Sequence, residues 1–160
     1  MKILILSDTH RSHKNYNKVL EKEGTIDMLI HLGDVEGGEY YIEETAGCPV
    51  HMVAGNNDFF SPLPREEEFY VGNKKIFITH GHYYYVATGN EHLIKAAKKR
   101  GADIVMFGHI HRPVQEQDGK MLILNPGSVS YPRQQGRRGT YMIMEINEQN
   151  EVQIELKYVD

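Results

Sequence analysis

The chain has 160 residues, 40% of them hydrophobic, which suits a single domain spanning 1–160 with one buried core. Its 22 acidic side chains outnumber 18 Lys and Arg, for a formal net charge of −4, so neither a long nucleic acid nor an anionic membrane is expected as a partner. The lone Cys48 cannot form a disulfide within the chain, and the apolar run at 3–6 is too short for a signal peptide or a membrane span. We therefore expect a cytoplasmic protein.

Short apolar runs alternate with helical patterns over the first two thirds of the chain, as in βαβ units. In chain order the sequence predicts a strand at 3–6, a helix at 15–22, a strand at 28–31, a helix at 39–45 and a strand at 50–53. A hairpin at 69–71 and 75–79, a helix at 91–100 and a strand at 104–107 follow. The remainder is almost all strand, with turns at 118–119 and 147–150. We expect an α/β domain with two sheets.

Five short polar motifs each follow an apolar, strand-forming run. They are Asp8-Thr9-His10, Gly33-Asp34, Gly55-Asn56-Asn57-Asp58, Thr79-His80-Gly81-His82 and Gly108-His109-Ile110-His111. Because the same kind of position, the end of a strand, supplies a ligand each time, we expect the motifs to build one metal site. Histidine, carboxylate and amide ligands without cysteine suit Mn²⁺, Fe²⁺, Co²⁺, Ni²⁺ or Zn²⁺ better than Ca²⁺ or Mg²⁺ alone.

Phosphate chemistry gives these ligands a further constraint. Metal sites that act on phosphate esters often hold two divalent ions about 3.5 to 4 Å apart, which share a carboxylate and a water whose pKa falls to roughly 7. Asp34 suits the shared position because Gly33 lets the backbone turn sharply at the strand end. His109 and His111, like Asp8 and His10, lie two residues apart, so each pair would project to one side of an extended segment and could serve one ion or two.

In this order, the motifs resemble the calcineurin-like metallophosphoesterases, in particular their small, single-domain prokaryotic phosphodiesterases. The segment Asn125-Pro126-Gly127-Ser128 resembles the family's downstream motif, so the likeness covers most of the chain. The resemblance implies a four-layer αββα sandwich of two mixed β-sheets flanked by helices. It also implies a dinuclear metal centre at which a bridging hydroxide hydrolyses small phosphodiesters.

The same resemblance implies a ligand set for each ion. The first ion would be held by Asp8, His10, Asp34 and His111. The second would be held by Asp34, Asn56, His80 and His109. Mn²⁺ is the first choice by resemblance, with Ni²⁺, Co²⁺, Fe²⁺ and Zn²⁺ as the alternatives.

Four neighbouring residues are candidates for catalysis or substrate binding. Well-known relatives carry a histidine where this chain has Asn57, whose amide can donate a hydrogen bond to a phosphoryl oxygen but no proton, so diesters with good leaving groups are favoured. Arg11 replaces a small residue and can pair with a phosphate oxygen or a substrate tail. Asp58, the third catalytic candidate, orients Asn57 or caps a turn. His82 contacts substrate or supports its loop.

Other chemically suggestive residues receive structural interpretations. The histidines outside the motifs are interpreted as surface or satisfied core residues: His13, His31, His51 and His92. The aromatic groups Phe59-Phe60 and Tyr83–Tyr85 are interpreted as packing, with nucleobase stacking or a homo-oligomer interface as the alternative. The arginines of 131–139 are interpreted as part of a solvated loop, and attraction of phosphate is the minority interpretation.

Two other functions are compatible with the motifs. A phosphomonoesterase or phosphoprotein phosphatase would use a similar centre, but Asn57 and the lack of room for a cap domain between the motifs argue mildly against it. A eukaryotic retromer subunit resembles this fold and acts mainly as a protein-interaction scaffold, so the fold alone does not establish catalysis. The complete ligand set favours an enzyme acting on a small phosphodiester.

Overall fold

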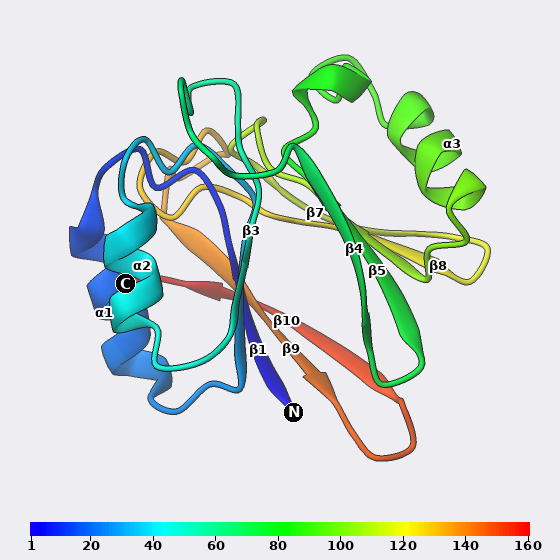
Figure 1. Cartoon of the computed structure of the whole chain (residues 1–160), viewed down its shortest axis with the longest axis horizontal. Coiled ribbons are helices and arrows are strands. Elements are labelled where there is room, and N and C mark those ends of the chain that lie inside the picture. The colour runs from blue at the N-terminus through cyan, green and yellow to red at the C-terminus, as the bar shows by residue number, and fades with distance from the viewer.

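Two five-stranded sheets lie face to face in the computed structural model, which describes residues 1–160 (Figure 1). The first sheet has the order β10 (Val152–Tyr158), β9 (Thr140–Ile146), β1 (Lys2–Leu6), β2 (Met28–His31), β3 (Val50–Met52). The second has the order β4 (Glu66–Val71), β5 (Lys74–Thr79), β6 (Ile104–Met106), β8 (Met121–Pro126), β7 (Pro113–Asp118). Each sheet combines three neighbouring parallel strands with antiparallel strands, so both are mixed.

Helices cover the outer face of each sheet. In Figure 1, α1 (His13–Glu23) and α2 (Glu39–Thr45) flank the first sheet, while α3 (Glu91–Lys99) flanks the second. A short 3-10 helix, η1 (His82–Tyr84), follows β5. The four layers confirm the αββα sandwich, and no helix is long and apolar enough to cross a bilayer.

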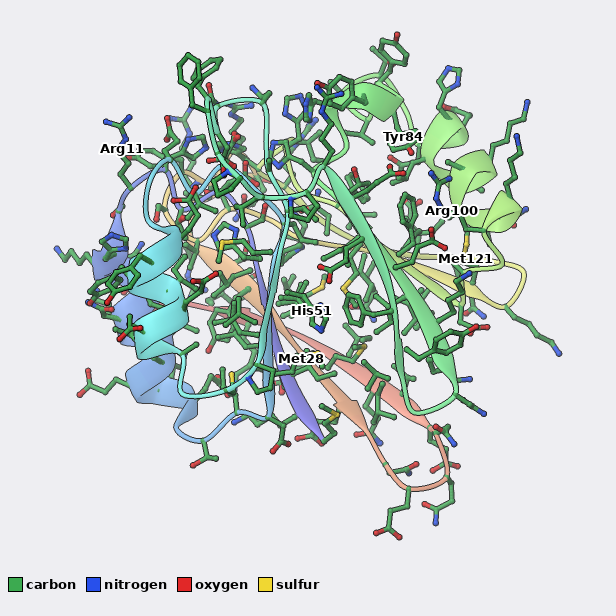
Figure 2. All side chains as sticks on the ribbon, viewed as in Figure 1. Arg11, Met28, His51, Tyr84, Arg100 and Met121 are labelled. Atoms are coloured by element: carbon green, nitrogen blue, oxygen red, sulfur yellow. The ribbon has the colours of Figure 1, made fainter.

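Three apolar clusters hold the layers together. Strand β1 contributes to two of them, which explains why residues 3–6 are all apolar. Ile3 and Ile5 belong to the cluster between the sheets, whereas Leu4 and Leu6 pack with residues of α1 and α2 on the opposite face. Side chains alternate along a strand, so burial of both faces requires every position to be apolar. Met28 lies in the inter-sheet cluster and Met121 in the one beneath α3 (Figure 2).

The predicted elements are present, with the largest difference at β4. This strand begins at Glu66, whereas the apolar pattern starts at Phe69. The Glu66 carboxylate accepts hydrogen bonds of 2.6 Å from both Arg100 and the Tyr84 hydroxyl, which are labelled in Figure 2. Since β4 is an edge strand, charged side chains fit there and also discourage pairing with another chain.

One end of the sandwich collects the loops that carry the motifs. The strands β1, β2 and β3 run parallel, as do β5 and β6, and the segments that follow these five strands lie at the top of Figure 1. Each of those segments contains one of the five polar motifs. The parallel topology therefore delivers motifs that are more than one hundred residues apart to one place, as the Asp8–His111 contact demonstrates.

Candidate metal centre

The first group of ligand atoms joins loops after β1, β2 and β6. The carboxylates and imidazoles of Asp8, His10, Asp34 and His111 can each offer an atom within 4.8 Å of the others. Asp8 Oδ1 lies 3.1 Å from His111 Nε2, and Asp34 Oδ2 lies 3.6 Å from His10 Nε2. The structure thus brings together the four residues that the family resemblance assigns to one ion.

The second group lies against the first and shares Asp34 with it. The Asn56 side-chain oxygen lies 3.0 Å from His80 Nε2 and 3.0 Å from His109 Nδ1. Asp34 Oδ2 lies 3.5 Å from His80 Nε2, close to its distance from His10. Asp34 therefore stands between the two groups, where a shared carboxylate has to be.

The hydrogen bonds around the first group leave its nitrogen lone pairs facing inward. His10 Nδ1 donates to the Glu36 carboxylate at 2.8 Å, and His111 Nδ1 donates to the Tyr131 carbonyl at 2.6 Å. In neutral rings the two Nε2 atoms then carry lone pairs, and they face each other at 3.2 Å. Such an arrangement is repulsive without a cation and matches the way proteins orient metal-binding histidines.

A buried carboxylate oxygen adds to this demand for positive charge. Ser7 Oγ donates to Asp8 Oδ2 at 2.5 Å and the His109 amide does so at 3.2 Å, whereas the buried Oδ1 has no hydrogen-bond partner. In the second group, His80 Nδ1 donates to the Leu32 carbonyl, so in the neutral form of this ring Nε2 carries a lone pair that faces the acceptor oxygen of Asn56. Buried acceptors without a hydrogen-bond donor are rare in folded proteins. Divalent ions would satisfy the acceptors of both groups, so these residues fit a metal site.

The charged groups are tuned in the same sense. Burial would raise the pKa of Asp8, but its neighbours His10, His111 and His80, when protonated in the metal-free protein, hold the pKa of Asp8 well below its usual range. Burial also opposes ionisation of Asp34, whose pKa is nevertheless lowered to about 2, chiefly by His80 and Asn57. Both carboxylates are therefore ionised at neutral pH, as metal binding requires.

The backbone at this site is strained. Asp8, His10, Asp34, His109 and His111 have positive φ angles of 55°, 45°, 57°, 71° and 56°. A non-glycine residue held in this region costs about 1 to 3 kcal/mol, and such residues cluster at functional sites. These angles also correct the expectation that each D-x-H or H-x-H pair projects from extended backbone, because tight left-handed turns orient the pairs instead.

Side chains from the last third of the chain brace these turns. Ser128 Oγ donates to the Asp8 carbonyl at 2.8 Å, and the Asn125 amide donates to the Gly108 carbonyl at 2.9 Å. Sequence reasoning recognised the 125–128 motif without assigning these contacts, and it missed Ser7 and Glu36 entirely. Glu36 follows Asp34 at the same two-residue spacing as that between Asp8 and His10. This spacing could have identified Glu36 as a residue of the site.

Asn57 and Asp58 both act on the turn that carries Asp34. Asn57 donates its backbone N–H to Asp34 Oδ1 and its side-chain amide to Asp34 Oδ2, each at 2.9 Å. The Asp58 carboxylate accepts the backbone N–H groups of Asp34, Gly55 and Glu36 at 2.8, 2.7 and 2.6 Å. Asp58 makes no hydrogen bond to the Asn57 side chain, which favours the turn-capping interpretation.

Arg11 and His82 each lie beside a different ligand group, next to His10 and His80 respectively. The exposed Arg11 projects outward from the rim in Figure 2, donates from Nε to the Glu36 carbonyl at 3.0 Å, and lines a cavity of about 530 Å³ with Asn57. The His82 ring lies 5.4 Å from the His80 ring, and its buried Nδ1 has no partner. Burial first, and then the charge of His80, lower the pKa of His82 to about 4, so its ring is neutral at pH 7.

The remaining histidines lie outside both ligand groups. His31 is buried, accepts the Gly33 N–H at Nδ1 and contacts Thr9 Oγ1 at 3.1 Å, which confirms it as a satisfied core residue. His51 pairs with Glu67 at 2.9 Å, and the last two lie against tyrosine rings: His13 against Tyr41 in a tilted contact and His92 against Tyr85 edge-on.

The packing interpretation of the aromatic pair near the site is wrong. Phe59 is 75% exposed and Phe60 is fully exposed, because both sit at the tip of the loop between β3 and β4. They line the same 530 Å³ cavity as Arg11. Apolar surface therefore borders the candidate site.

Known proteins with similar sequences are metallophosphoesterases. The family model of the calcineurin-like phosphoesterase superfamily domain matches residues 1–149. The chain is 33% identical over 134 residues to a probable metallophosphoesterase of Bacillus subtilis, covering 83% of this chain and 78% of that protein. It is 32% identical over 145 residues to a phosphodiesterase of Methanocaldococcus jannaschii, covering 79% and 83%.

Solved structures share the whole fold. A predicted phosphoesterase from Streptococcus pneumoniae superposes with a TM-score of 0.80 at 29% identity, covering 98% of this chain and 97% of that one. Vps29 from Entamoeba histolytica, solved in complex with Zn²⁺, superposes with a TM-score of 0.79 at 26% identity and covers both chains completely.

Proposed function

The chain belongs to the calcineurin-like phosphoesterase superfamily, and we propose that it is a metal-dependent phosphodiesterase that hydrolyses small phosphodiesters at a dinuclear centre. The observation that carries the proposal is the position of Asp34, whose Oδ2 lies 3.6 Å from His10 Nε2 in one ligand group and 3.5 Å from His80 Nε2 in the other. We also infer that residues 1–160 form a single domain, since the inter-sheet core combines the first and last strands.

The proposed ligands follow the two groups. Asp8, His10 and His111 would hold one ion, Asn56, His80 and His109 the other, and Asp34 both. When bound, two divalent ions would neutralise charge on a phosphoryl group and supply a nucleophile from water at neutral pH. Mn²⁺ is our first choice, and Ni²⁺, Co²⁺, Fe²⁺ and Zn²⁺ are compatible with the same donors.

The chain's own groups would orient this chemistry. Asn57 fixes the Asp34 carboxylate through two hydrogen bonds, and its amide keeps a second hydrogen for a phosphoryl oxygen. Asp58 fixes the same turn from behind. Neither Asn57 nor the exposed Arg11 can deliver a proton at neutral pH, so the leaving group has to depart as a stable anion.

The test combines metal analysis with two chromogenic substrates. Protein stripped with a chelator should bind two Mn²⁺ ions per chain and hydrolyse bis(p-nitrophenyl) phosphate faster than p-nitrophenyl phosphate. Asp34→Asn should lose the tight binding of both ions and the activity, whereas Asp118→Asn, at the end of β7 and paired with Lys98, should lose neither. Faster hydrolysis of the monoester would instead identify a phosphomonoesterase.

A protein-interaction scaffold is the second candidate, favoured by the full-length likeness to Vps29. That relative was solved with Zn²⁺, so metal binding alone does not separate the two functions. Metal-loaded protein that hydrolyses neither diester nor monoester would overturn the enzymatic proposal in favour of the scaffold.

A further inference from the structure

A second cavity, of about 610 Å³, adjoins the first ligand group and does not include Arg11 in its lining. Its lining consists of His10, His111, Tyr131, Pro132, Arg133 and Arg137. No carboxylate lines this cavity, and neither arginine side chain forms a hydrogen bond or an ion pair within the protein. The loop thus presents two free guanidinium groups beside two candidate metal ligands.

Backbone hydrogen bonds hold the loop at 131–137, which carries Arg133 and Arg137, against the candidate ligand His111. His111 Nδ1 donates to the Tyr131 carbonyl at 2.6 Å, and the Arg133 N–H donates to the His111 carbonyl at 2.9 Å. Ser128 Oγ accepts the Tyr131 N–H at 2.8 Å, and the same hydroxyl binds the Asp8 carbonyl. Arg133 therefore starts from a backbone position that is set by the metal centre itself.

The 530 Å³ cavity lined by Arg11 has the reverse chemistry. Its lining includes Glu36, Glu39, Glu43 and Asp58, together with the exposed rings of Tyr40, Phe59 and Phe60. Arg11 is its only cationic side chain, and Arg11 Nε is already bonded to the Glu36 carbonyl. An anionic substituent would be repelled there, whereas an uncharged aromatic one would find apolar surface.

We propose that Arg133 and Arg137 form an anion subsite that selects phosphodiesters whose retained substituent carries a second anionic group, either a phosphate or a carboxylate. The inference rests on the proposed function, because it places the scissile phosphate at the metal centre, whose residues His10 and His111 line one cavity and whose neighbour Asn57 lines the other. Guanidinium groups bind such anions through paired, charge-assisted hydrogen bonds. The uncharged leaving substituent then occupies the flank of Arg11 and Phe60.

Two substrates that differ only in the second anion test the subsite. They are thymidine 5′-(p-nitrophenyl phosphate) with and without a 3′-phosphate. The wild-type kcat/KM should be about tenfold or more higher for the 3′-phosphorylated ester, since charge-assisted hydrogen bonds reach this magnitude. The double variant Arg133→Gln/Arg137→Gln should bring the ratio close to one while changing kcat/KM for the ester without the 3′-phosphate only about twofold.

Arg138→Gln is the matched control on the same loop. The Arg138 guanidinium bonds to the Asp160 carbonyl and stacks 4.0 Å from the Tyr158 ring, outside the cavity. This variant should keep the wild-type ratio. Thermal unfolding of each variant excludes loss of the fold as the cause of a changed ratio.

A binding measurement separates failure of the subsite from failure of the proposed function. In calorimetry with Mn²⁺-loaded protein, thymidine 3′,5′-bisphosphate should bind about tenfold more tightly than thymidine 5′-monophosphate, and the double variant should lose this preference. If neither ester is hydrolysed, the proposed function fails, and the bisphosphate preference still decides the subsite. If both esters are hydrolysed equally well, or the double variant keeps the preference, the subsite is overturned.

Discussion

Asn57 binds the carboxylate of Asp34 twice, through its backbone N–H and through its side-chain amide, each at 2.9 Å. The residue that replaces the usual histidine of the family resemblance therefore holds a proposed bridging ligand. Substitution of Asn57 can therefore have two effects. It changes whether the side chain can donate a proton, and it removes one of the two hydrogen bonds that position Asp34.

Substitution Asn57→His is expected to change the dependence on the leaving group. In the wild type, kcat should fall steeply as the leaving-group pKa rises, because no general acid assists departure. The imidazole can act as a general acid, which typically accelerates such a step about a hundredfold. The ratio of the rate for alkyl leaving groups to the rate for p-nitrophenol should therefore be about a hundredfold higher in the variant than in the wild type. A series of diesters of graded leaving-group pKa measures both slopes. A flat wild-type slope would contradict the prediction.

Removal of the Glu36 side chain should weaken metal binding without touching a metal ligand. Glu36 accepts the His10 Nδ1 proton at 2.8 Å, and loss of such a partner typically lowers metal affinity about 10- to 100-fold. Competition with a chromogenic chelator gives the affinity of Glu36→Ala. Glu39→Ala is the control, because Glu39 lines the neighbouring cavity but bonds to Ser61. Equal affinities for the two variants would argue against the role of Glu36.

Replacing each histidine of the 109–111 pair should empty a different half of the centre. His109 lies 3.0 Å from Asn56, whereas His111 lies 3.1 Å from Asp8. His109→Ala and His111→Ala should each retain about one ion per chain, in opposite positions. Mass spectrometry gives the stoichiometry, and anomalous diffraction locates the remaining ion. The same residual position in both variants would refute the division.

A pH-dependent contribution to stability is expected far from the metal centre, at Glu23. Burial would raise the pKa of Glu23, but hydrogen bonds from Lys157, Tyr141 and Lys2 lower it to about 2, from an ordinary value of 4.5. A depressed folded-state pKa stabilises the protein above pH 4.5, and the benefit is lost as the pH falls towards 2.

Glu23→Gln should accordingly be less stable than the wild type at pH 7, and the gap should narrow between about pH 4.5 and 2. Urea unfolding across this range measures the gap. The exposed Glu148→Gln should show no such convergence. A gap that stays constant with pH would exclude the linkage to Glu23.

The sequence predicted the architecture of the site better than its local geometry. Fully apolar runs such as 3–6 required strands buried on both faces, and parallel strands necessarily gather their carboxyl ends. The spacing of Asp8 and His10 wrongly suggested extended backbone, because left-handed φ angles depend on distant braces such as Ser128. The exposure of Phe60 also depends on tertiary structure, since aromatic content alone favours burial.

The inward-facing lone pairs of His10 and His111 repel each other, and the turns that hold them are strained. Both effects destabilise the metal-free folded protein. Ions that bind only the folded chain would stabilise it in proportion to the logarithm of their concentration. Metal supply would then govern how long the protein survives as well as how fast it works. Starved of metal, the chain would become a better substrate for proteases at the loops where it would otherwise be most rigid.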